Sequence, residues 1–433
     1  MGYLSSEMMI EKYNKIKFRC FHGYNVGDML TLLMNLADCI EGKDITLKTA
    51  LKASLVQILY EHYEYETKIS QDTHILGYTS YHGSHHRKTF ESVAKLDAKM
   101  DYIAENQMQK RINLIRSFKV FVNQLSWFWS MRKCGTTIKH ALWLNSYLSH
   151  VYDFKIKVMD RIIDFDKYNL IYTFYDLEPV QNLLIQKAKL FGIKTATLQH
   201  GAGFYAGDVE AQSVSDLGIE FRKSISDYML VWNSFAQKEG IKCGVPKNKL
   251  VVSGIPKFIG LRSEDRAYNF EIKQKVFGVI LDITSWGNEQ NIKMLRLANE
   301  IAEKNQMYYI VRYHPTSKRS EYDNIIDKRY LKCICKPDVL IEDFANQVDF
   351  SIVDGSSVLV ELIYLHSVAF RYRFSENDKF AGVSINSVDC YEELQSYLDD
   401  KEKVIEGCKK LFDIYCTVDD ARKGYYSFFS CYM

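Results

Sequence analysis

The strongest constraint on how this chain folds is the alternation of short apolar runs with helical segments. Strand-like runs occur at 73–80, 170–174 and 195–199, and a helical pattern at 179–191 separates the last two. Strands that alternate with helices in this way form parallel β-α-β units with right-handed crossovers. The sequence therefore predicts an α/β fold built on parallel sheets.

A second series of the same kind follows a polar stretch at 261–273. Its strand-like runs lie at 275–282, 307–313 and 348–353, again separated by helical patterns. A chain of 433 residues also exceeds what one hydrophobic core usually serves. We therefore expect two α/β domains that meet in the polar stretch.

The segment before the first strand has a different pattern. Apolar residues recur at helical spacing at 29–40 and 47–65, which predicts a helical extension. The last helical pattern, at 391–412, is expected to lie back across the first domain. Three parts follow: a helical extension at 1–70, a first α/β domain at 71–265 and a second at 266–433.

Charge balance and cysteine spacing exclude several classes of protein. With 56 basic and 54 acidic residues the formal net charge is +2, which argues against a nucleic-acid-binding protein. The ten cysteines form no C-x-x-C pair and no zinc pattern, so we expect reduced cytoplasmic thiols and no bound metal. The N-terminal segment carries charges where a signal peptide is apolar, and no run is long enough to span a membrane. We expect a cytoplasmic protein or one at the inner face of the plasma membrane.

Ligands of open α/β sheets bind at the carboxyl ends of the strands. Gln199, His200 and Gly201 stand at such an end, directly after an apolar run. A histidine titrates near neutrality, and a flanking glycine lets the backbone approach a ligand. His200 is therefore a candidate catalytic residue, the alternative being a histidine satisfied by backbone carbonyls beside a turn.

Two further strand ends in the second half carry groups suited to a phosphate. Arg312 and His314 follow one apolar run, and a proline after His314 makes the turn rigid. Another run stops at the sequence DGSSVLVE, where a helix is expected to begin with free backbone N–H groups. The residues assigned to this anion site are Asp354, Ser356 and Ser357, with Glu361 one turn later as an acceptor for a ribose hydroxyl. The alternative is an ordinary helix cap with a solvated glutamate.

Smaller candidates lie at other strand ends. Asp176 or Glu178 is a candidate catalytic base, and Thr284 with Ser285 a candidate phosphate cradle; helix capping is the alternative for both pairs. The basic stretch 81–88 offers His85, His86 and Arg87 to an acceptor or a pyrophosphate, or forms a solvated loop.

The order of these motifs resembles that of the GT-B glycosyltransferase superfamily. The motifs are QHG after a strand, DYMLVWNS, VSGIPK, RYHP and DGSSVLVEL, which together span residues 73–361. The likeness is greatest to bacterial capsule and teichoic-acid enzymes, including CDP-glycerol glycerophosphotransferase-like proteins and the HP-motif sialyl- and Kdo-transferases. The resemblance implies two Rossmann-like domains that face each other across a cleft. It also implies a transferase that takes a UDP-, CMP- or CDP-linked sugar to a glycan or lipid-linked acceptor.

The resemblance also implies roles for single residues. It places His314, Ser356 and Ser357 on the donor phosphates, Gly254 of the VSGIPK segment in the donor site, and His200 between the domains. GT-B enzymes generally need no metal, because helix dipoles and basic side chains stabilise the leaving nucleotide. Three alternatives remain: transfer of a polyol phosphate from a CDP-linked donor, epimerisation by a nonhydrolysing sugar-nucleotide 2-epimerase, and nucleotide or glycan binding without turnover.

One helical stretch also suggests membrane contact. Residues 110–133 combine six basic residues with three adjacent aromatic ones, at 127–129, inside a longer helical pattern at 107–147. Such a helix rests well on an anionic membrane and would suit a lipid-linked acceptor. A core helix with its basic residues in water is the alternative.

Overall fold

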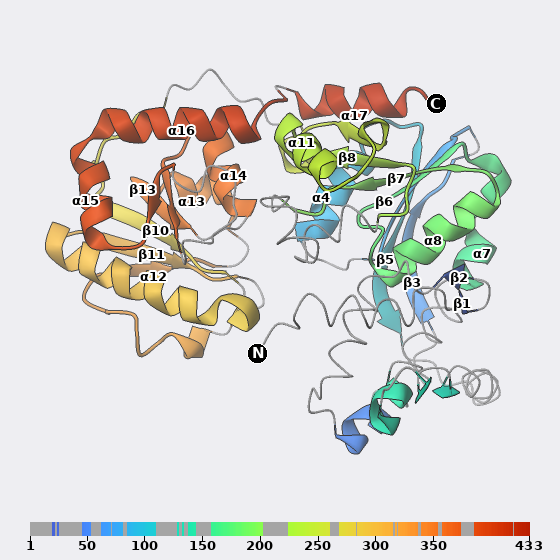
Figure 1. The fold of residues 1–433 in the computed structure, drawn as a ribbon, viewed down its shortest axis with the longest axis horizontal. Coiled ribbons are helices and arrows are strands. Elements are labelled where there is room, and N and C mark those ends of the chain that lie inside the picture. Colours follow the sequence, from blue (N-terminus) through green and yellow to red (C-terminus); the bar gives the residue numbers. More distant parts are fainter. Residues whose placement is uncertain are drawn as a thin grey trace.

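The computed structural model places two parallel sheets side by side, joined near the C-terminus by a pair of long helices (Figure 1). No helix among the described residues is long and apolar enough to cross a membrane. The structure describes residues 20–21, 24–25, 46–52, 62–70, 72–80, 85–109, 128–129, 132–133, 137–143, 157–201, 224–259, 268–282, 284–314, 317, 319–336, 339–353, 357–373, 385–418 and 420–433.

The first sheet has seven strands in the order β3-β5-β4-β6-β7-β8-β9. All neighbours are parallel except the edge strand β3, which pairs antiparallel with β5. Their bounds are β3 His62–Lys68, β4 Ile75–Thr79, β5 Met100–Gln109, β6 Leu170–Thr173, β7 Lys194–Leu198, β8 Tyr228–Val231 and β9 Leu250–Val252. The inner strands are apolar on both faces because helices cover both. These helices and short 3₁₀ turns are α4 His85–Ala94, α7 Lys157–Ile162, η3 Phe165–Lys167, α8 Pro179–Leu190, α11 Ser234–Lys242, η4 Lys247–Lys249 and η5 Pro256–Phe258.

The second sheet has six parallel strands in the order β12-β11-β10-β13-β14-β15. Their bounds are β10 Val276–Ile280, β11 Tyr308–Arg312, β12 Leu331–Ile334, β13 Phe350–Val353, β14 Ala369–Tyr372 and β15 Ser387–Val388. Alternate residues of a strand point to opposite faces, so Phe277 and Val279 of β10 enter one core and Val276 and Ile280 the other. The covering elements are α12 Thr284–Asn305, η6 Arg319–Glu321, α13 Ile341–Ala345, α14 Ser357–Tyr364, α15 Tyr391–Asp399 and α16 Lys401–Tyr415.

The end of the chain ties the two sheets together. Helix α16 packs on the second sheet, whereas α17 (Ala421–Phe429) inserts Tyr425 and Phe429 into the core of the first (Figure 1). Two glycines allow this helix to come close. A Cβ at Gly424 would lie 2.4 Å from the carbonyl oxygen of Ser253, and one at Gly254 would lie 2.8 Å from the Cα of Ala421. The crossover is therefore built into backbone contacts that larger residues would block.

The structure differs from the sequence expectations mainly at the edges of the sheets. The prediction of a helix at 47–65 is wrong for its last residues, because β3 begins at His62 and pairs with β5 in the first sheet. The helix expected to start at 107 is likewise wrong, since β5 continues to Gln109. Residues 20–21 and 24–25 form a small antiparallel pair, β1 (Cys20–Phe21) and β2 (Tyr24–Asn25), inside the expected helical extension.

Candidate active site

Three strands of the second sheet end level with one another. Ile280 of β10 pairs in register with Arg312 of β11 on one side and with Val353 of β13 on the other. The chain runs outward from β10 through β11 to β12, then returns to the other side of β10 at β13. Such a reversal of strand order is where open α/β sheets bind ligands, beyond the carboxyl ends of the strands.

His314 stands at this edge, just after β11. It is half-buried, and loss of water lowers its pKa while the nearby Asp282 carboxylate opposes the shift. The backbone at Asp282 is fixed by the Asn291 amide, which accepts from its N–H and donates to its carbonyl, both at 2.9 Å. The same amide donates to the Tyr322 hydroxyl. The loop after β10 is thus held rigidly beside an imidazole that can still take up a proton.

Other residues predicted for the donor phosphates have mixed positions. Thr284 and Ser285 open α12, and Ser357 opens α14, so these three residues stand at the starts of helices as expected. The side chains of Thr284 and Ser285 lie outside the described residues, and so do Asp354 and Ser356. Arg312 has partners within the second domain, and its donor role stays a prediction. Its guanidinium donates to the carbonyl of Val339 at 2.8 Å and lies over the ring of Phe344, because it follows the β12–α13 side of the sheet.

His200 lies beyond the end of β7 in a cluster of rings. Its ring centroid is 4.6 Å from that of Tyr175, 4.7 Å from that of His86 on α4 and 5.7 Å from that of Phe174. These residues come from three chain segments that meet where β4 and β6 reverse the order of the first sheet. Of the basic stretch 81–88, His86 therefore joins the predicted catalytic histidine at the switch point.

The surroundings of His200 hold it neutral. Loss of water is the larger cause and the positive charge of Lys257 the smaller one, and together they lower the pKa of His200 to about 4. At neutral pH the imidazole therefore carries no charge, and one of its two ring nitrogens is unprotonated. Such a group can accept a proton from a hydroxyl but does not carry a resting charge.

The two residues that flank His200 differ in their surroundings: Gln199 holds the loop in place, and Gly201 borders open space. Gln199 is buried: its side-chain oxygen accepts from the Trp232 N–H at 2.7 Å, and its side-chain nitrogen donates to the carbonyl of Gly201. Gln199 thus fixes the loop through both ends of its side-chain amide, and its contact with an acceptor stays a prediction. A Cβ at Gly201 would meet nothing within 4 Å, so the space beside it is open.

Both carboxylates predicted as catalytic bases accept hydrogen bonds within the first domain. Asp176 is buried, and one of its carboxylate oxygens accepts from the Ser224 hydroxyl and from the N–H and hydroxyl of Ser226, at 2.7–2.9 Å. Glu178 caps α8, accepting from the N–H groups of Val180 and Gln181. These contacts favour the structural alternative, because a carboxylate after a strand serves equally well to fix the next element; a catalytic role for either residue stays a prediction.

Two more of the predicted site residues also make contacts within the protein. Arg87 is buried in ion pairs with Glu66 and Glu91 and donates to the carbonyl of Glu105, so its charge is already neutralised. Gly254 has a φ of +93° and its close approach is to α17, not to a ligand. His85 begins α4, and its side chain lies outside the described residues.

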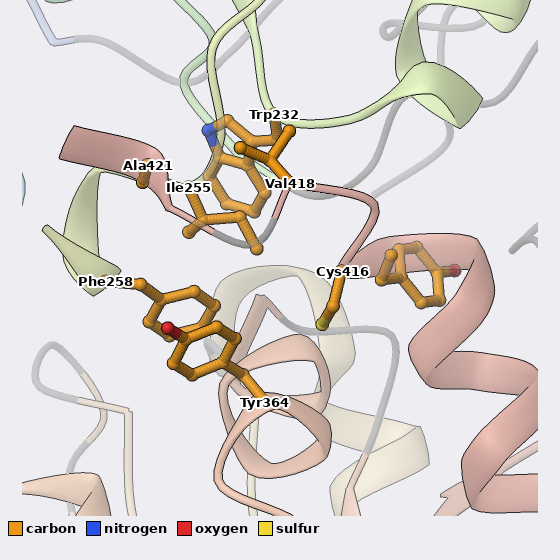
Figure 2. A pocket seen from close by; sticks show the side chains of 8 residues that line it. Trp232, Ile255, Phe258, Tyr364, Cys416, Val418 and Ala421 are labelled. Carbon is orange, nitrogen blue, oxygen red and sulfur yellow. The ribbon is translucent and has the colours of Figure 1, made fainter. Parts of the chain in front are cut away.

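Sequence reasoning missed the residue that joins the two edges. Lys257 on η5, from the first domain, forms an ion pair with Glu361 on α14, from the second. Next to it, the rings of Phe258 and Tyr364 stack with centroids 3.6 Å apart and planes 11° apart (Figure 2). The only signal was the lysine in the VSGIPK segment, whose contact with Glu361 depends on how the domains meet.

The apolar side of this joint is closed. Trp232, Ile255, Phe258 and Tyr364 line it together with Cys416 and Ala421 near the crossover (Figure 2). The cavity left between them is about 10 Å³, no more than one water molecule needs. The only metal-type cluster found among the described residues, Asp389, Cys390 and Glu393, lies elsewhere, and Arg373 already pairs with both of its carboxylates.

Comparison with known proteins identifies the fold. No protein-family model and no curated protein matches the sequence. Among solved structures, the chain is similar to UDP-GlcNAc 2-epimerase from Neisseria meningitidis bound to UDP-GlcNAc, with 10% identity, a TM-score of 0.53, and 83% of this chain and 99% of that chain covered. It is also similar to the S. aureus MnaA–UDP co-structure, with 12% identity, a TM-score of 0.52, and coverage of 83% and 97%. The wall teichoic acid polymerase TagF matches with 13% identity over 93% and 97% of the chains, but its TM-score of 0.42 carries no argument. The chain therefore has the GT-B fold, as the motif order implied.

Proposed function

We propose that this protein is a GT-B glycosyltransferase that moves a sugar from a nucleotide-activated donor to a glycan or lipid-linked acceptor in cell-surface glycan synthesis. The donor is a UDP-, CMP- or CDP-linked sugar bound between the carboxyl edges of the two sheets. The observation that carries the proposal is the contact between those edges, where Lys257 meets Glu361 beside a neutral His200. His314 with the start of α14 then forms the donor side.

The two histidines divide the chemistry between them. An acceptor hydroxyl attacks the anomeric carbon while its proton passes to the neutral imidazole of His200. The bond from that carbon to the phosphate oxygen breaks, and the electron pair leaves with the nucleotide. His314 and the backbone N–H groups at the start of α14 stabilise the charge that develops on the phosphate. Because basic groups and helix N-termini supply this stabilisation, we expect transfer to proceed in EDTA.

Two other reactions on the same fold are separated by their products. Transfer of a polyol phosphate from a CDP-linked donor would use the same groups with attack at phosphorus, and would release CMP. Epimerisation of UDP-GlcNAc, the substrate bound in the similar Neisseria structure, needs acids and bases at one sugar and no acceptor. The buried Asp176 and the capping Glu178 argue against that reaction here.

The test is a transfer assay with UDP-, CDP- and CMP-linked donors, with and without acceptor, in which nucleotide release and sugar epimerisation are both followed. We expect acceptor-dependent release from one donor and a loss of that release in His314→Ala. The matched control is His74→Ala. His74 is an exposed histidine just before β4, at the amino end of the first sheet. Unchanged turnover by His314→Ala would contradict the donor role, and acceptor-independent epimerisation would replace the transferase with an epimerase.

Membrane contact through 110–133 is part of the proposal. Most of this segment lies outside the described residues, but Trp129 is 63% exposed and Arg132 and Lys133 are exposed as well. An exposed tryptophan beside basic residues is suited to the surface of an anionic membrane. We expect removal of the basic charges at 110–133 to weaken sedimentation with phosphatidylserine vesicles; unchanged sedimentation would reject the contact.

A further inference from the structure

The ion pair between Lys257 and Glu361 is unusual in its position. It is one of the points where the two domains touch, and both side chains are largely out of water, with 23% and 13% of their surfaces exposed. A partly buried ion pair gains little stability over apolar residues of similar size, because both charges lose hydration. The domains already hold together beside it through the Phe258–Tyr364 stack. Adhesion between the domains therefore does not explain why charges stand here.

The surroundings of Lys257 suit an anion. The positive charge of Lys257 contributes to the lowered pKa of His200, so the two side chains lie within electrostatic reach of each other. Glu361 lies one turn inside α14, whose first residue, Ser357, follows the end of β13. An anion at the start of α14 would meet the positive end of the helix and, one turn away, the lysine ammonium.

We infer that Lys257 binds the phosphates of the donor nucleotide, and that Glu361 is the partner it leaves when the donor arrives. Without donor, the carboxylate of Glu361 neutralises the ammonium and keeps the two edges in contact. With donor, the ammonium moves to the diphosphate and the carboxylate is released to accept from the ribose. Donor binding thus exchanges one anionic partner of the lysine for another, and the ribose hydroxyls replace the ammonium as hydrogen-bond donors to Glu361. This inference rests on the proposed function, which supplies the nucleotide.

Inorganic pyrophosphate is the probe for this exchange, because it carries the diphosphate of the donor without the base or the sugar. We expect Lys257→Met to weaken pyrophosphate, UDP and CDP binding by roughly 10- to 100-fold, the loss of one hydrogen bond between charged groups, while uridine and cytidine bind as before. Glu361→Gln should bind pyrophosphate more tightly than the wild type, because nothing then competes for the lysine. The same variant should bind uridine or cytidine more weakly. Isothermal titration or an NMR titration measures all of these affinities.

The matched control is Lys187→Met. Lys187 is a similarly buried lysine, paired with Asp160, near the end of α8 and away from both carboxyl edges. If the Lys257 pair only holds the domains together, both Lys257→Met and Glu361→Gln will lower the melting temperature and leave pyrophosphate affinity equal to that of Lys187→Met. That result overturns the exchange. Pyrophosphate and nucleotide responses as expected, with no sugar transfer from any donor, would instead overturn the proposed reaction and leave Lys257 as the phosphate ligand.

Discussion

A histidine with a proposed role lies at the carboxyl edge of each sheet, and the two edges affect its pKa differently. His200 lies among the rings of His86, Phe174 and Tyr175 with a lysine nearby, so burial and a like charge both lower its pKa, to about 4. His314 is half-buried beside Asp282, whose carboxylate opposes the effect of burial on its pKa. The pKa of both imidazoles is lowered by burial, but a neighbouring positive charge adds to this effect at His200, whereas a neighbouring carboxylate opposes it at His314.

This difference teaches how one fold separates two tasks with the same residue type. A general base must be unprotonated before the reaction, and rings that exclude water achieve this without a second titratable partner. A group that stabilises a leaving phosphate is most useful when it can carry a charge, and an adjacent carboxylate keeps that state accessible. The local environments of the two histidines therefore differ in the way that the two proposed roles require, although the motifs QHG and YHP look equally polar in the sequence.

The largest effect should come from removing either of the two histidines. His200→Ala should lower kcat by roughly 10²- to 10⁴-fold with little change in donor KM, because a base acts mainly in the transition state. His314→Ala should lower kcat and also weaken donor binding. Steady-state kinetics with the donor varied measures both. Equal effects of the two variants on donor KM would break the comparison between the edges.

The next largest effect should be on stability, at helix α17, which crosses from the second domain to the first. Gly424→Ala should reduce the free energy of unfolding by about 1–3 kcal/mol, because its Cβ would lie 2.4 Å from the Ser253 carbonyl oxygen. Urea denaturation measures this loss. Gly244→Ala is a useful control, since a Cβ there meets nothing within 4 Å and only the backbone conformation, at φ +86°, is unfavourable. A Gly424→Ala protein as stable as the wild type would show that α17 is not tightly seated.

A smaller effect should distinguish framework carboxylates from catalytic ones. Asp176→Asn weakens the acceptor of three hydrogen bonds, so we expect a loss of about 1–3 kcal/mol in the free energy of unfolding. Turnover per folded molecule should stay the same, because the carboxylate points into a buried cluster. Thermal denaturation and kcat measured on one preparation test this together. A fall in kcat of more than 100-fold with normal stability would restore Asp176 as a base.

The smallest effect is electrostatic. Lys257→Met should raise the pKa of His200 from about 4, by less than about one unit, since burial is the larger cause and remains. The depressed pKa also means that the unfolded chain binds a proton between about pH 6.5 and 4 that the folded protein does not. Stability is therefore lost as pH falls through that range, and His200→Phe should reduce the loss. An NMR titration of the His200 ring measures the shift; an unchanged pKa in Lys257→Met would place the lysine too far away to act with it.

Strands that are contiguous apolar runs were predictable from sequence, and strands that carry polar or charged residues were not. Strands such as β6 and β10 are contiguous apolar runs with helices on both faces, and that pattern identifies them directly. Edge strands lack this signal: β3 reads HYEYETK, and β12 has two exposed residues among its four. β14 was hidden by Arg371, a buried charge inside an otherwise apolar run.

The candidate site was predictable where chemistry follows from position along one strand. His200 and His314 were found because a histidine after an apolar strand belongs to the carboxyl edge. The roles of Asp176 and Glu178 do not follow from position alone, because a carboxylate at the same place can just as well fix a neighbouring backbone. Lys257 was missed because its partner, Glu361, is 104 residues away and is brought to it only by the meeting of two domains.

The most direct test of the account is a thermal-shift measurement of the wild-type protein and His314→Ala against UDP, CDP, CMP, GDP and dTDP, with and without EDTA. A ligand raises apparent stability only by binding the folded state, by about 2.7 kcal/mol at one hundred times its Kd. The account predicts that UDP, CDP or CMP stabilises the wild type equally in EDTA, and that His314→Ala responds much less. Absence of a shift with every nucleotide, or a full response from His314→Ala, would contradict a donor site at the edge of the second sheet.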